Sequence, residues 1–239
     1  MSGETSRLGR HDWPRLDPAR LHIFSDFDGT ITDNDTLVFL TTHLGGGLEF
    51  VRQMGPRLRR HEISLRECIA TEMATIRQPF SEAEKLLRAR VQLDPQFIPF
   101  AEWCRAQQLP LTVLSAGFHQ TIELFLPQAE FPYLTILANE LEPDAERGWQ
   151  CHFRDTTPEG HDKAAALRQA RAQGQHTIFI GDGYSDRSAA EAADEVFAKH
   201  TLATYCHERG IAFHPYQTFA EVWAQLRARL ASVGEASGS

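Results

Sequence analysis

The sequence of 239 residues has few cysteines, no net positive charge and no long hydrophobic run. Its four cysteines, Cys68, Cys104, Cys151 and Cys206, are far apart and form no Cys-x-x-Cys pair, which argues against a disulfide framework or a zinc site. The formal charge of −8 excludes a general basic surface for nucleic acid. No apolar run approaches the length of a membrane span. These absences predict a soluble, cytoplasmic protein with no nucleic-acid or membrane partner.

Hydrophobic residues make up 42% of the chain, enough for one large domain or a domain with an insertion. Short apolar runs that suit buried strands alternate with helical patterns. The predicted strands cover residues 21–25, 111–114, 134–138, 177–180 and 196–198, with a hairpin partner at 149–153 and a last helix at 219–230. This alternation predicts an α/β fold, a Rossmann-like parallel sheet with helices on both faces.

The first chemical motif places two carboxylates at the end of the first predicted strand. Asp26 and Asp28 lie in the segment Asp-Phe-Asp-Gly-Thr, and if the backbone stays extended their side chains face the same way. In open α/β sheets ligands bind at the carboxyl ends of strands. Carboxylates about 4 Å apart repel by about 4 kcal/mol at an effective dielectric of about 20, and Mg²⁺ would offset this repulsion. The alternative is an Asp-Gly turn that only closes a strand.

A second acidic motif, Gly-Asp-Gly-Tyr-Ser-Asp, follows the predicted strand at 177–180. Asp182 would lie in the loop after this strand, and Asp186 at the N-cap of the next helix. As a cap alone, Asp186 would contribute about 1 kcal/mol, and Asp182 would be only a turn residue. Both structural interpretations stay open at this point.

Two further segments add groups that bind anions. Ser115-Ala116-Gly117 ends the strand at 111–114, where small residues let backbone N–H groups and a hydroxyl approach an anion. Lys163 starts an alanine-rich helix, where a positive charge opposes the helix dipole, and this placement favours a functional role. The neighbouring His119 and His161 are interpreted as polar residues at helix starts rather than as catalysts.

These four segments, in their order along the chain, resemble the haloacid dehalogenase superfamily of phosphohydrolases over residues 21–199. The resemblance implies that Asp26 is the nucleophile that becomes an aspartyl-phosphate. It implies that Asp28 is the general acid and base, a residue that dehalogenases of the superfamily lack. Lys163 would neutralise charge on the transferred phosphoryl group.

The resemblance also implies the cofactor and the groups that bind it. Mg²⁺ would be held by Asp26, by the backbone carbonyl of Asp28 and by Asp182, with Asp186 a ligand or a neighbour of the ligands. The phosphate would be bound by Lys163 and four residues of the loops: Thr30, Ser115, Ala116 and Gly117.

Residues 35–105 contain no good strand but show helical spacing at 36–40, 65–76 and 81–91. This insertion resembles the small cap domain of the branch that includes phosphoserine phosphatase, which closes over the site. The predicted organisation is an extension at 1–20, a HAD-like core at 21–34 and 106–230, a helical cap at 35–105, and a flexible tail at 231–239. Ser81 is expected to begin a capping segment, and Gly45 to Gly47 to form a helix–helix turn.

Finer similarities indicate a substrate. Residues 115–118 and 193–199 look like the subgroup around the methionine-salvage phosphatase, which acts on 2-hydroxy-3-keto-5-methylthiopentenyl 1-phosphate. The resemblance therefore favours a small phosphorylated metabolite, with that compound ranked above phosphoserine. A phosphomutase and a non-catalytic binding protein on the same fold are the remaining alternatives. Phe213, Tyr216 and Phe219 fit either a homodimer interface or, more simply, core packing under the last helix.

Overall fold

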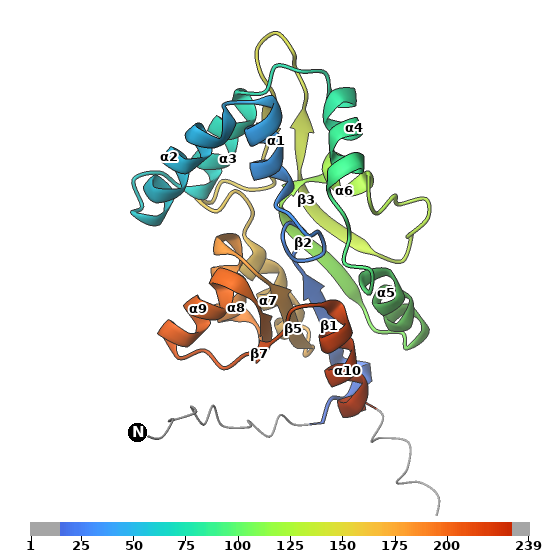
Figure 1. Cartoon of the computed structure of the whole chain (residues 1–239). Coiled ribbons are helices and arrows are strands. Elements are labelled where there is room, and N and C mark those ends of the chain that lie inside the picture. Colours follow the sequence, from blue (N-terminus) through green and yellow to red (C-terminus); the bar gives the residue numbers. More distant parts are fainter. Residues whose placement is uncertain (1–14, 231–239) are drawn as a thin grey trace, which may run out of the picture.

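The central feature of the computed structural model is one mixed sheet, and the structure describes residues 15–230 (Figure 1). The first fourteen residues of the predicted extension and the predicted tail at 231–239 lie outside the described residues. Seven strands of the described part follow the order β4-β3-β2-β1-β5-β6-β7. Their bounds are Leu21–Ser25 (β1), Leu111–Phe118 (β2), Thr135–Glu142 (β3), Gln150–His152 (β4), His176–Gly181 (β5), Glu195–Ala198 (β6) and His214–Pro215 (β7).

Strand β1 lies at the centre of the sheet, which explains its apolar sequence. Ile23 pairs in parallel with Leu111 of β2 on one side and with Ile178 of β5 on the other. Strands β3, β6 and β7 extend the parallel arrangement outwards. Strand β4 pairs antiparallel with β3, as the predicted hairpin requires. The predicted α/β fold with a mostly parallel sheet is confirmed.

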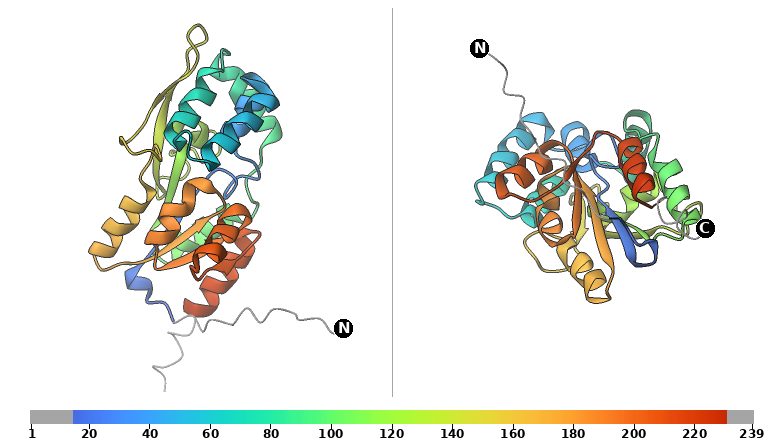
Figure 2. Two further views of the ribbon diagram at one scale, coloured as in Figure 1. Left: turned by 90° about the vertical axis from the view of Figure 1, so that its left-hand side faces the viewer. Right: turned by 90° about the horizontal axis from the view of Figure 1, so that it is seen from below.

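Helices cover both faces of the sheet, as the two views in Figure 2 show. Alternate side chains of β1 explain this, because Ile23 packs on one side, against α5 (Phe97–Ala106) and α10 (Phe219–Leu230). Phe24 packs on the other side, against α7 (Lys163–Ala172), α8 (Arg187–Ala192) and α9 (His200–Arg209).

The three aromatic residues considered for an interface pack against the hydrophobic clusters on the two faces of the sheet. Tyr216 and Phe219 are buried in the cluster that contains Ile23, and Phe213 packs partly buried on the other face, so core packing accounts for all three. Within the described part of the chain, no helix combines the length and the apolar character that a membrane crossing requires.

Four helices form a layer beyond the carboxyl ends of the strands (Figure 1). They are α1 (Thr36–Leu44), α2 (Gly47–Arg59), α3 (Leu65–Ala74) and α4 (Phe80–Arg90). Gly45 and Gly46 lie between α1 and α2 and form the expected turn with Gly47, the first residue of α2, whose φ of 84° favours glycine. Ser81 does not cap α4, because the helix begins at Phe80 after Pro79. The capping box of this layer belongs instead to Ser64 and Glu67 of α3.

The helical layer is smaller than the predicted cap of residues 35–105. Helix α5 lies within the predicted range, yet Phe97 and Phe100 are buried in the same cluster as β1 and α10. Helices α1, α3 and α4 share their apolar cluster with the ends of β2 and β3. The α5 segment therefore packs as part of the sheet domain, and its apolar face explains why.

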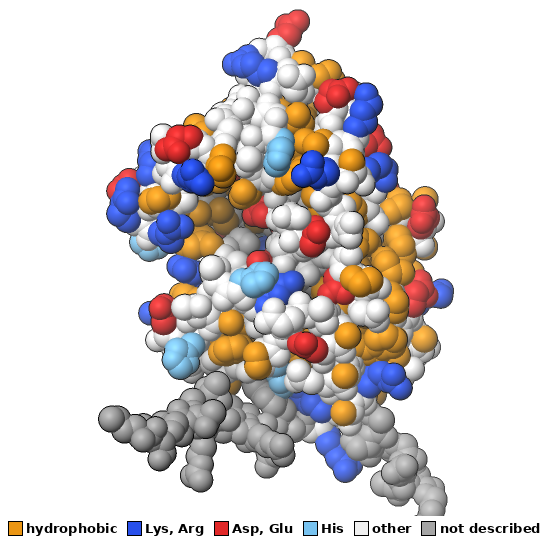
Figure 3. All heavy atoms as spheres, viewed as in Figure 1, with side chains coloured by type: hydrophobic (Ala, Val, Ile, Leu, Met, Phe, Trp, Pro, Cys, Tyr) orange, Lys and Arg blue, Asp and Glu red, His pale blue; other side chains and the backbone are white. Residues whose placement is uncertain are grey.

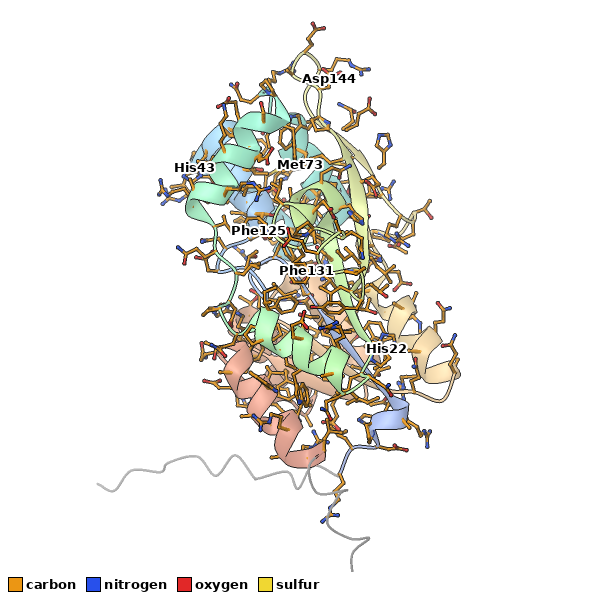
Figure 4. The ribbon with its side chains drawn as sticks, turned by 90° about the vertical axis from the view of Figure 1, so that its right-hand side faces the viewer. His22, His43, Met73, Phe125, Phe131 and Asp144 are labelled. Carbon is orange, nitrogen blue, oxygen red and sulfur yellow. The ribbon has the colours of Figure 1, made fainter. Side chains whose placement is uncertain are left out.

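The β3–β4 hairpin fastens the helical layer to the sheet. In Figure 4, Asp144 marks the tip of this hairpin beside the helical layer, and His22 lies towards the opposite end of the sheet. Trp149 is buried, its backbone N–H donates to the Ile76 carbonyl at 3.3 Å, and its indole N–H donates to the Gln78 carbonyl at 2.9 Å. The hairpin thus holds the segment between α3 and α4 in place.

Candidate active site

A cavity of about 220 Å³ lies between the helical layer and the carboxyl ends of the strands. Figure 3 shows the molecule hollowed at its left side, between the helices α2 and α3 above and α8 and α9 below. The loops after β1 and β5 and the last residues of β2 supply its lower wall, and helices α1, α2 and α3 its upper wall. The topology therefore brings the predicted motifs together at one edge of the sheet, where α/β folds bind ligands.

Lys163 and two aspartates form a buried ion cluster at the base of the cavity. The Lys163 ammonium donates to Asp26 Oδ1 at 2.6 Å and to Asp186 Oδ1 at 2.7 Å, and all three side chains are almost fully buried. Burial and the nearby Asp186 raise the pKa of Asp26 well above its usual range. Burial lowers the pKa of Lys163, but the ion pairs with Asp186 and Asp26 outweigh it and raise that pKa. Lys163 thus holds the Asp26 carboxylate at a fixed position.

Asp26, Asp182 and Asp186 can together hold a divalent cation. Each offers a carboxylate oxygen, and these oxygens lie within 4.8 Å of one another. Gly29 makes the approach of Asp182 feasible, because its φ is 74° and a Cβ there would lie 2.7 Å from the Asp182 carboxylate. An all-oxygen donor set suits Mg²⁺, so these residues fit the implied ion. The Asp28 side chain lies outside this set, and ligation by its backbone carbonyl stays a prediction.

Asp186 does more than begin a helix. It occupies the N-cap position of α8, but its side chain makes no capping bond there. Instead its Oδ2 accepts hydrogen bonds from the backbone N–H groups of Asp182 at 2.9 Å and Gly183 at 3.0 Å. Burial and the Asp186 charge raise the pKa of Asp182 to about 6. The interpretation of Asp186 as a mere cap is therefore wrong, because its side chain shapes the second acidic loop.

Asp28 lies beside Ser115 and Gly117, near the end of β2. Its Oδ1 accepts from the backbone N–H of Thr36 at 2.9 Å and from the Thr36 hydroxyl at 2.5 Å, and the Ser115 hydroxyl donates to its Oδ2 at 3.4 Å. Gly117 allows this proximity, since a Cβ there would lie 2.6 Å from Oδ2. Burial and the neighbouring Asp35 raise the pKa of Asp28 to about 7. A carboxyl group with this pKa can both donate and accept a proton near neutral pH.

Ser115, Ala116 and Gly117 line the cavity, whereas Thr30 does not. The Gly117 N–H donates to the Ser115 hydroxyl at 2.9 Å, which folds the loop around this side chain. The Thr30 hydroxyl donates to Asp182 Oδ1 at 3.3 Å, so Thr30 supports a metal-site carboxylate. Its predicted contact with phosphate has no counterpart in the cavity lining.

Several residues near the cavity were not predicted as parts of the site. His161 is buried with its Nδ1 2.7 Å from the Ser115 carbonyl oxygen, so it supports the end of β2 rather than only starting a helix. Asp35 caps α1 by accepting from the backbone N–H groups of residues 37 and 38, and it also lines the cavity. Glu72 of α3 is buried and lines the cavity from the cap side. The Lys199 ammonium donates to the Thr30 carbonyl at 3.3 Å.

The sequence signals for these residues differ. An aspartate directly before a helical pattern, as at position 35, is a recognisable N-cap signal. Glu72 carries no such signal, because one acid in an amphipathic helix usually faces solvent.

The family model described as haloacid dehalogenase-like hydrolase matches residues 23–191. Among curated proteins, the Pdp3-interacting factor 1 of Schizosaccharomyces pombe is 32% identical over 87% of this chain and 95% of its own length. The polyol phosphate phosphatase PYP1 of Saccharomyces cerevisiae is 32% identical over 87% of this chain and 93% of its own length. A 2-hydroxy-3-keto-5-methylthiopentenyl-1-phosphate phosphatase of Bacillus cereus is 27% identical over 87% and 96%.

A solved structure has the same fold. A phosphoserine phosphatase with an analogue of the phospho-aspartyl intermediate superimposes with a TM-score of 0.68 and 16% identity. The match covers 87% of this chain and 99% of that one. At this identity the match concerns the fold, including the helical layer over the strand ends.

Proposed function

Because the chain belongs to the haloacid dehalogenase-like hydrolase family and is a phosphatase, we propose that it hydrolyses small phosphate monoesters through an aspartyl-phosphate on Asp26. The observation that carries the proposal is the base of the cavity, where Lys163 holds the buried Asp26 carboxylate. Asp28 follows Asp26 by two residues in the segment after β1, and the Ser115 hydroxyl donates to its side chain. The groups proposed as nucleophile, proton donor and anion binders therefore surround one space.

In the first step an Asp26 oxygen attacks phosphorus, and the bond from phosphorus to the ester oxygen breaks. Asp28 gives its proton to that oxygen, and the alcohol leaves. In the second step Asp28 takes a proton from water, whose oxygen attacks phosphorus and releases inorganic phosphate and Asp26. The pKa of Asp28, about 7, suits both directions of transfer.

Positioning and charge stabilisation account for the remaining catalysis. The Ser115 hydroxyl and the backbone of Ala116 and Gly117 line the cavity, where they would bind phosphate oxygens. Lys163 would balance charge on Asp26 during transfer. Mg²⁺ held by Asp26, Asp182 and Asp186 would supply further positive charge and orient the phosphate.

The cavity volume favours a small substrate. About 220 Å³ is less than the roughly 300–1,000 Å³ of pockets for drug-sized ligands. The substrate named by the sequence resemblance, 2-hydroxy-3-keto-5-methylthiopentenyl 1-phosphate, is also that of a 27% identical relative, whereas a 32% identical relative is named for polyol phosphates. We propose both as substrates to test ahead of phosphoserine.

The test measures inorganic phosphate released from these esters with Mg²⁺ and with EDTA. Asp26→Asn should reduce turnover by about a thousandfold or more while the fold stays intact. Asp144→Asn, at the hairpin tip, is the matched control and should retain wild-type turnover. Retained turnover in Asp26→Asn would remove this residue from the nucleophile's role. Release without any sugar bisphosphate would argue against a phosphomutase.

A further inference from the structure

Glu72 is a buried carboxylate that lines the cavity and has one weak hydrogen-bond donor among the described residues. Its side chain comes from α3 of the helical layer, and the residue is only 6% exposed. Its Oε1 accepts a hydrogen bond from the Cys68 thiol, a weak donor, at 3.7 Å. A buried carboxylate with so little compensation costs stability. The position of such a group on a cavity wall indicates a ligand that supplies the missing hydrogen bonds.

The part of the cavity around Glu72 is acidic. Asp28 and Asp35 also line the cavity, and the Asp35 charge helps to raise the pKa values of both Asp28 and Glu72. Among the described residues that line the cavity, none is lysine or arginine. Lys163 lies below and is engaged by two aspartates. A leaving group that carries its own carboxylate would therefore meet repulsion and no counter-charge.

The remaining wall is apolar. Val38, Val51, Leu58, Leu65 and Ile69 line it from α1, α2 and α3. An acidic edge beside an apolar wall suits a molecule with a hydrocarbon face and several hydroxyl groups. Building on the phosphatase function proposed above, we propose that Glu72 accepts hydrogen bonds from leaving-group hydroxyls. Glu72 thereby makes the site selective for phosphate esters of uncharged polyols over esters that carry a carboxylate.

Hydroxyl groups suit Glu72 in either of its protonation states. Burial and the nearby Asp35 raise the pKa of Glu72 to about 7, so both protonation states are populated at neutral pH. A carboxyl group of this kind both accepts and donates hydrogen bonds, and a hydroxyl also does both.

The test compares kcat/KM for four phosphate esters of similar size: glycerol 3-phosphate, 3-phosphoglycerate, propyl phosphate and phosphoethanolamine. Glycerol 3-phosphate and 3-phosphoglycerate differ by a carboxylate in place of a hydroxymethyl group. We expect the wild type to prefer glycerol 3-phosphate to 3-phosphoglycerate by about a hundredfold. The preference for glycerol 3-phosphate over propyl phosphate should be about tenfold lower in Glu72→Leu than in the wild type. Glu72→Gln, which keeps the shape, should lower the preference over 3-phosphoglycerate by about tenfold.

The control is Glu49→Gln, which removes an exposed carboxylate of α2 outside the cavity lining and should leave both ratios unchanged. Unchanged ratios in both Glu72 variants would overturn the assignment of Glu72 while the phosphatase function stood. A wild-type preference for phosphoethanolamine would show a cation site and overturn the polyol assignment. Failure of the wild type to release phosphate from any ester with Mg²⁺ would instead overturn the proposed function, and this inference with it.

Discussion

Buried charges gather at both ends of the sheet, but the two clusters differ in their balance. At the carboxyl ends of β1 and β5, Lys163 lies between Asp26 and Asp186, and Asp182 adds a third carboxylate. At the amino end of β6 a single acid, Glu195, is surrounded by basic side chains. One cluster therefore has excess negative charge, and the other is balanced by the protein itself.

The geometry at Glu195 explains its balance. Arg229 binds it with both terminal nitrogens, at 2.6 and 2.7 Å, while His176 and His214 lie at 2.8 and 3.1 Å. Burial raises the pKa of Glu195, but the hydrogen bonds from Arg229, His176 and His214 outweigh it and lower that pKa. At the other cluster the pKa values of Asp26 and Asp182 are raised. The comparison teaches that the Glu195 cluster stabilises the fold, whereas the Lys163 cluster retains repulsion that a bound cation would relieve.

Removal of the lysine should have the largest effect. Lys163→Met leaves Asp26 and Asp186 buried without their shared cation, and we expect a loss of about 3–5 kcal/mol in the free energy of unfolding. Urea denaturation in EDTA measures it. The double variant with Asp26→Asn should recover part of the loss, because one buried charge is gone. A loss below about 1 kcal/mol would contradict the assigned role of this ion cluster.

Neutralising the acid of the balanced cluster should cost less. We expect Glu195→Gln to lower the free energy of unfolding by about 2–3 kcal/mol without changing kcat. The folded-state pKa of Glu195 is below the unfolded value of about 4.3. Its stabilisation is therefore complete above about pH 5 and is lost as the pH falls towards the folded-state pKa. Thermal unfolding of both proteins from pH 7 to pH 3 should show the stability difference between wild type and Glu195→Gln becoming smaller. A difference that grows as the pH falls would contradict this account.

The two clusters also differ in how far the sequence could predict them. Asp26, Lys163 and Asp182 were predicted because each belongs to a local pattern of strand, turn and helix. The partners of Glu195 were not, since they come together only when β5, β6, β7 and α10 pack. Strand β7 is two residues long, too short to give a pattern.

Tertiary packing also decided the points on which the sequence analysis was incomplete or wrong. The apolar face of α5 suits either the cap or the sheet domain, and only its contacts with α10 separate the two. The orientation of Asp186 depends on Lys163, which is 23 residues away in the chain. Glu72 joins the site only because α3 folds back over the strand ends.

Asp182→Asn should have the smallest effect, with a sign that depends on the metal. In EDTA the variant should be about 1 kcal/mol more stable than the wild type, because a carboxylate is removed from beside Asp26 and Asp186. With Mg²⁺ the order should reverse, since the wild type binds the ion more tightly and gains stability from it. Thermal unfolding of both proteins at increasing Mg²⁺ concentrations checks the order of stability without and with the ion. The variant should also need more Mg²⁺ for turnover. Equal stabilisation of both proteins by Mg²⁺ would show that other residues hold the ion.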